Sequence, residues 1–158
     1  METDRLLGIG TGRLIGWYPP QLSCIASPYI DRESLRDAPV FSNDTEFGGD
    51  GDPRASSSVD DGDCVTDGPF ADLVLPFYNS DDHDHCLSRA FSDGQTHGHL
   101  PGDQVQPAAL DTILLQPDYQ SFLSKLEAGP HNHIPNGIGG DFLRFTAPND
   151  PLFYLHHA

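Results

Sequence analysis

The stretch that decides the fold covers residues 129–158 and reads GPHNHIPNGIGGDFLRFTAPNDPLFYLHHA. It contains four of the eight histidines of the chain, placed around a Gly-Gly turn and an Asn-Asp-Pro turn. Neutral imidazole is a preferred ligand of copper, zinc and iron. The pattern therefore indicates a metal site in this stretch.

The adjacent histidines at its end, His156 and His157, follow a favourable helix start. Pro151 suits the first position of a helix, because its φ is fixed and an N–H is not needed there. Neighbouring side chains on a helix diverge by about 100°, so we expect one of the pair to face a metal. We favour His157, which shares a face with Phe153 at i,i+4. His156 is then a neighbouring group rather than a ligand.

The remaining ligand must come from His131 or His133, further up the chain. At this point the residues resemble a known family. The runs PHN, IGGDF and FTAPNDPLFYLHHA resemble the second copper-binding signature of tyrosinases and related polyphenol oxidases, most of all the fungal members. Such proteins hold two coppers by three histidines each and oxidise phenols with dioxygen. The resemblance implies His131 as the first ligand of the second copper and His157 as the third.

The middle ligand of this signature departs from the family pattern. Four residues after His131 the chain has Pro135, which cannot coordinate a metal and disfavours helix at Ile134. Three interpretations remain open: the subfamily differs, His133 substitutes from a turn, or the site is short of a ligand.

The resemblance also implies a catalytic role for Asn132. In the family, an Asn directly after the first ligand is associated with orienting a water that deprotonates an incoming monophenol. The alternative is an Asn that is merely tolerated in a turn.

Composition and charge narrow the classes of partner. The chain has 158 residues, of which 37% are hydrophobic, with Gly 16 and Pro 14, so we expect one domain rich in loops. Its net charge of -16 opposes binding to nucleic acid or to an anionic membrane. No stretch approaches the roughly 20 apolar residues that span a bilayer, and the first residues lack a secretory pattern. The localisation stays open.

The resemblance divides the chain into two parts. Residues 1–36 match nothing recognisable, and residues 37–158 resemble a tyrosinase-like copper-binding domain that is truncated after Ala158. Because no histidine precedes His83, we expect the second copper half without the first. The implied fold is mainly α: a partial helical bundle with long irregular loops rich in Gly and Pro.

Local patterns predict two helices and a short extended segment. One helix follows Pro107, and a second follows Asp118 and ends at Gly129, so that His131 comes just past its end. Residues 70–78 are a short strand or a buried extended segment that Pro76 interrupts.

Three cysteines and four further histidines lie outside the stretch 129–158. Cys64 and Cys86 both lie in the family-like region, so a disulfide that closes a loop of about 20 residues is one interpretation, and two free thiols are the other. Cys24 has no assigned role. We expect the remaining histidines to be solvated at the surface: His83, His85, His97 and His99.

The resemblance implies an oxidoreductase that converts phenols or catechols to o-quinones with dioxygen and two copper ions. We expect at most one copper in this chain, and no activity from the chain alone. Two alternatives stay open: a non-catalytic remnant, and a mononuclear zinc hydrolase. In the hydrolase His131, His133 and His157 would hold the zinc, and Asp141 or Asp150 would act as the base.

Overall fold

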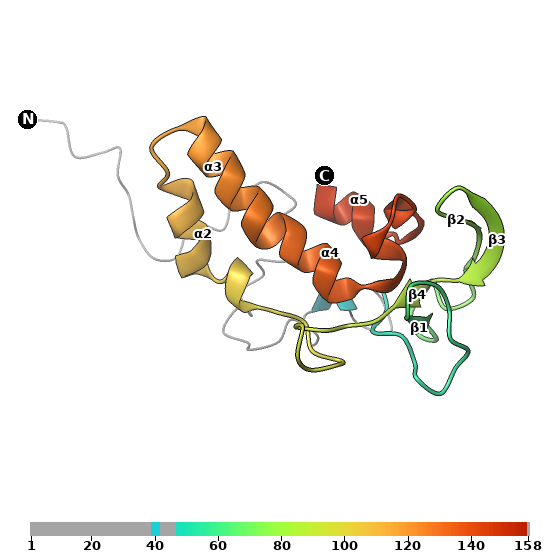
Figure 1. Cartoon of the computed structure of the whole chain (residues 1–158). Coiled ribbons are helices and arrows are strands. Elements are labelled where there is room, and N and C mark those ends of the chain that lie inside the picture. Colours follow the sequence, from blue (N-terminus) through green and yellow to red (C-terminus); the bar gives the residue numbers. More distant parts are fainter. Residues whose placement is uncertain (1–38, 42–46, 158) are drawn as a thin grey trace, which may run out of the picture.

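The computed structural model describes residues 39–41 and 47–157 of the chain (Figure 1). The unassigned segment 1–36, and Cys24 with it, lies outside the described residues. Short strands come first and helices follow. In chain order the elements are β1 (Asp63–Cys64), β2 (Val74–Tyr78), β3 (Asp81–Cys86), β4 (Ser88–Arg89), α2 (Pro107–Leu114), α3 (Tyr119–Leu126), α4 (Asn132–Ile138) and α5 (Leu152–His157).

The strands form two small antiparallel pairs. β1 pairs with β4, and β2 pairs with β3. The predicted extended segment is therefore a strand in its second half. Its register shifts between Leu75 and Phe77, where Pro76 has no N–H to give to a neighbouring strand.

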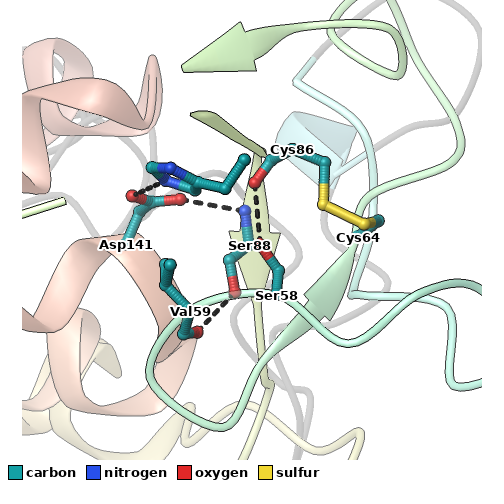
Figure 2. The surroundings of a disulfide bond; sticks show 7 residues. Ser58, Val59, Cys64, Cys86, Ser88 and Asp141 are labelled. Carbon is teal, nitrogen blue, oxygen red and sulfur yellow. Dashed lines mark hydrogen bonds and ion pairs between the residues drawn. A yellow bond between two sulfur atoms is a disulfide. The ribbon is translucent and has the colours of Figure 1, made fainter. Parts of the chain in front are cut away.

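A disulfide joins Cys64 at the end of β1 to Cys86 at the end of β3 (Figure 2). The two residues are separated by 22 positions, and their Cα atoms lie 5.5 Å apart. The predicted pairing is confirmed, and the alternative of two free thiols is excluded for this structure. Closing a loop of this size contributes about 3 kcal/mol in the chain-entropy account.

Both predicted helices are confirmed. α2 begins with Pro107, and the Asp118 side chain caps α3 by accepting from the backbone N–H of Ser121 at 2.9 Å. The two helices pack through a small apolar cluster. Figure 1 shows α2 beside α3. No helix in the described part of the chain is long and apolar enough to cross a bilayer.

The helical backbone is interrupted at Gly129, as the predicted stop requires, and the segment Glu127–His131 leads from α3 into α4. The backbone bends at Gly129 (φ −96°, ψ −119°), a conformation that a residue without Cβ adopts easily. His131 comes just past this break, as predicted, and its own backbone is helical (φ −61°, ψ −43°) at the start of α4. Ile134 is also helical and buried despite the proline that follows it, contrary to expectation.

The main core lies under α4, α5 and the segment between them. It consists of Phe41, Phe91, Leu100, Val105, Ile134, Ile138, Phe142, Ala147 and Leu152. The Gly-Gly turn fits this segment to β4. Both glycines have positive φ, 70° at Gly139 and 53° at Gly140, and a Cβ on Gly140 would collide with the carbonyl oxygen of Ser88. The Ala90 N–H donates to the Ile138 carbonyl at 2.9 Å, which fastens the end of α4 beside β4.

Candidate metal centre

Three histidines meet where the segment Glu127–His131 faces the end of α5. His131, His156 and His157 each offer one ring nitrogen, and these three atoms lie within 4.8 Å of one another. The rings of His131 and His156 are stacked, with centroids 5.3 Å apart and an interplanar angle of 24°. The ring of His157 stands edge-on to that of His131, at 5.4 Å and 88°. We call these residues the histidine group.

The placement of His156 differs from the sequence-based expectation that only one of the adjacent histidines can face a shared point. The rings of His156 and His157 have centroids 4.7 Å apart and stand at 89° to each other. Although their Cβ directions diverge along the helix, the ring of His131 contacts both rings. The expectation failed because it considered α5 alone.

His133, the predicted substitute ligand, does not join the histidine group. It lies two residues after His131 in a helical run, and two residues correspond to a rotation of about 200° around a helix. Its side chain is half-buried. Asn132, the predicted catalytic residue, is the first residue of α4 and is exposed beside His131.

Hydrogen bonds to backbone carbonyls leave one ring nitrogen of His156 and one of His157 available. The Nε2 of His156 lies 3.1 Å from the His131 carbonyl oxygen, and the Nδ1 of His157 lies 2.9 Å from the Phe153 carbonyl oxygen. Because an acceptor fixes the proton on the nitrogen that faces it, the lone pairs are left on Nδ1 of His156 and Nε2 of His157. The Nδ1 of His131 lies 2.9 Å from a carboxylate oxygen of Glu127, without a hydrogen bond.

His156 has the surroundings of a neutral ligand. Burial, and next the neighbouring His157, lower its pKa to about 4, although its hydrogen bond to the His131 carbonyl acts in the opposite direction. Its Nδ1 is buried and has no hydrogen-bond partner. Buried polar atoms without a partner are uncommon, and a metal ion would satisfy this one. Three imidazole nitrogens suit copper, zinc or iron, so these residues fit the metal that the sequence implied.

A buried ion pair holds α5 in place. Asp150 accepts from Arg89 at 2.8 Å and 2.9 Å, and both side chains are 0% exposed. One oxygen of Asp150 also accepts from the Leu152 N–H at 2.9 Å, at the start of α5. The Arg89 guanidinium also donates to the carbonyl oxygens of Phe47, Gly48 and Gly49. A helix of six residues is marginal alone, so this network positions the pair of histidines at its end.

Asp141 takes part in a second buried network, shown in Figure 2 beside the disulfide. It accepts from the Ser88 N–H at 3.0 Å, and the Nε2 of His85 lies 2.9 Å from its other oxygen. The prediction of a solvated His85 is therefore wrong, because this ring is buried. His83 and His97 are exposed, and His99 is half-buried beside Asp93.

These networks weigh against the zinc hydrolase. Asp141 and Asp150 are both fully buried, and each carboxylate is occupied by a cationic or imidazole partner and a backbone N–H. A general base must reach the proton that it removes. Neither carboxylate can approach a metal-bound water without breaking these contacts.

Comparison with known proteins agrees with the site. The family described as the common central domain of tyrosinase matches residues 18–158. The chain therefore belongs to the tyrosinase family, as the residues 129–158 indicated, and the match begins within the segment that the sequence left unassigned.

Relatives from fungi and bacteria share this region. The chain is 42% identical over 140 residues to the tyrosinase-like protein phomQ1 of Diaporthe leptostromiformis, with 82% of this chain and 36% of that protein aligned. It is 40% identical over 129 residues to the tyrosinase ustQ of Aspergillus flavus, covering 82% and 36%. A tyrosinase of Streptomyces lincolnensis is 32% identical over 150 residues, covering 85% and 50%. The chain thus spans about a third to a half of these relatives.

Proposed function

We propose that this chain supplies one copper site of a tyrosinase-type oxidase, which converts small phenols or catechols to o-quinones with dioxygen. The observation that carries the proposal is the histidine group: one ring nitrogen from each of three histidines, all within 4.8 Å of one another, in a member of the tyrosinase family. Bound copper supplies the redox chemistry between the phenol and dioxygen, and the protein supplies orientation and a pocket.

The chain's own residues bind the metal and shape its surroundings. His131, His156 and His157 would hold one copper ion, and each ring is oriented by a hydrogen bond or ion pair through its second nitrogen. The Phe153 ring lies 4.2 Å from the ring of His157 and provides an aromatic surface beside the site. Asn132 is placed next to His131, where it could orient a water toward a phenol. The chain's net charge of -16 favours a neutral phenol over an anionic substrate.

We propose further that turnover needs a second copper site from outside the described residues. Dioxygen takes up more than one electron in this chemistry, and the family uses copper in pairs. The histidine group accounts for three ligands, enough for one ion. His83 and His97 lie on separate segments, and both are exposed.

Oxygen uptake with a catechol tests this function. We expect no copper-dependent uptake from the 158-residue chain after loosely held metal has been removed by a chelator. We expect uptake from a protein extended to the length of its relatives from the same genomic locus, and its loss on His157→Ala. Chelator-resistant turnover by the short chain would contradict the need for a second site. A fully extended protein that binds copper without turnover would establish the non-catalytic alternative instead.

A further inference from the structure

Pro135 leaves a backbone carbonyl available at the histidine group. In an α-helix the N–H of each residue donates to the carbonyl four positions earlier. For position 135 that carbonyl belongs to His131, and both residues lie in helical backbone. A proline has no N–H to donate, so residue 135 cannot occupy the His131 carbonyl.

His156 uses this carbonyl. Its Nε2 lies 3.1 Å from the His131 oxygen, across 25 positions of sequence. A carbonyl only accepts, so the contact places the proton of the neutral imidazole on Nε2 and the lone pair on Nδ1. That Nδ1 is buried without a hydrogen-bond partner, and His156 is one of the three residues whose donor atoms converge within 4.8 Å.

We propose that Pro135 is a positioning residue for the metal centre. By leaving the His131 carbonyl without its helical partner, it holds the His156 ring in the tautomer and orientation that turn Nδ1 toward His131 and His157. The third nitrogen of the group thus comes from α5, while position 135, one turn after His131, carries no donor atom. For its metal-binding consequence, this inference rests on the proposed copper site.

The two possible roles of Pro135, a structural role alone or the positioning of His156, predict different effects of its replacement. Proline in a helix interior is unfavourable, and alanine is the best helix former. Replacing Pro135 should therefore leave the fold as stable as before, or more so. If Pro135 also positions His156, the same replacement restores an N–H that competes for the His131 carbonyl. Stability and metal affinity then change in opposite directions, which general damage to the fold would not produce.

The first measurement uses the metal-free 158-residue chain. Nitrogen-15 NMR of the imidazole rings should show His156 in the Nε2–H tautomer in the original chain, and a mixture of tautomers in Pro135→Ala. The matched control is Asn136→Ala on the same helix, which raises helix propensity but adds no N–H, and it should keep the original tautomer. An unchanged tautomer in Pro135→Ala would overturn the inference. If the alanine variant does not fold, Pro135→Ser restores the same N–H and tests the same change of the His156 tautomer.

The second measurement is copper affinity under a competing chelator, with thermal unfolding recorded on the same samples. Loss of a contact that orients a metal ligand weakens affinity by about tenfold or more, and we expect this in Pro135→Ala with an unfolding midpoint no lower than the original. Asn136→Ala should keep the original affinity. Equal affinities in the two variants would contradict the inference. If the original chain binds no copper, the proposed function fails, whereas the tautomer measurement still decides the role of Pro135.

Discussion

At the scale of single residues, the histidine group depends on which ring nitrogen each imidazole leaves available. Backbone carbonyls hold the second nitrogen of His156 and of His157, and the Glu127 carboxylate faces that of His131. Such contacts fix both ring orientation and tautomer. The folded chain therefore orients the rings of His156 and His157 before any metal binds, and it keeps His156 buried and neutral.

The neutral His156 predicts how stability depends on pH. Its pKa is about 4 in the folded chain, below the ordinary histidine value of 6.5 that applies to the unfolded chain. Between these values the unfolded chain binds a proton that the folded chain does not, so the free energy of unfolding falls as the pH is lowered through this window. The loss is about 2 kcal/mol, after allowance for partial solvation of the ring, and it is absent above the window.

Urea unfolding of the metal-free chain at pH 7.5 and at pH 4.5 checks this prediction. The decrease in unfolding free energy should be smaller in His156→Asn, which removes the titrating ring. His97→Asn is the matched control, because His97 is exposed, and it should keep the full decrease. An equal decrease in all three proteins would show that other groups govern the acid response.

Two members of the histidine group could be predicted from the sequence and one could not. His131 and His157 follow from the position of each within a family-like signature. His156 was set aside because adjacent side chains diverge on an isolated helix. In the folded chain the ring of His131, 25 positions earlier than His156, contacts the rings of both His156 and His157.

At the scale of elements, the buried ion pair between Arg89 and Asp150 decides whether α5 keeps its place. Removing one partner of a buried pair leaves the other charge without compensation, which costs about 3 to 5 kcal/mol. We expect Arg89→Met to lower the unfolding free energy by this amount. Asp150→Asn should cost less than Asp150→Ala, because an amide oxygen can still accept from the Leu152 N–H.

Denaturant unfolding of these variants provides the measurement, and Arg54 provides the control. Arg54 pairs with Asp52 at 3.0 Å, but its side chain is 88% exposed. Exposed ion pairs contribute little, so Arg54→Met should leave the unfolding midpoint unchanged. Equal destabilisation by Arg89→Met and Arg54→Met would show that the buried pair has no special part in holding α5.

The helices could be predicted better than the way in which they join. Apolar spacing and capping residues were sufficient for α2 and α3, because those signals are local. The stop predicted at Gly129 agrees with the non-helical backbone at that residue, but no local signal showed that helical backbone resumes at His131, at the start of α4. The Arg89–Asp150 pair joins residues 61 positions apart, and no local pattern indicates which buried arginine meets which aspartate.

At the scale of the whole molecule, contacts with β4 and a nearby disulfide hold the metal-binding stretch, residues 129–158, against the rest of the chain. β4 contacts the Gly-Gly turn and supplies Arg89 for the start of α5, and the Cys64–Cys86 disulfide closes the loop that leads into β4. The disulfide could be predicted because both cysteines lie in the family-like region. A mainly α helical bundle stays a prediction, because the chain spans about a third of the first relatives.

The most direct test of the account is copper binding by single histidine variants of the 158-residue chain. Electron paramagnetic resonance of Cu²⁺, read under a competing chelator, reports both occupancy and the number of nitrogen ligands. We predict one tightly held ion with three nitrogen ligands in the original chain. His131→Ala, His156→Ala and His157→Ala should each lose it, whereas His133→Ala should retain it. Retention of the original signal by His156→Ala, or its loss in His133→Ala, would contradict the central claim that His131, His156 and His157 form the metal centre.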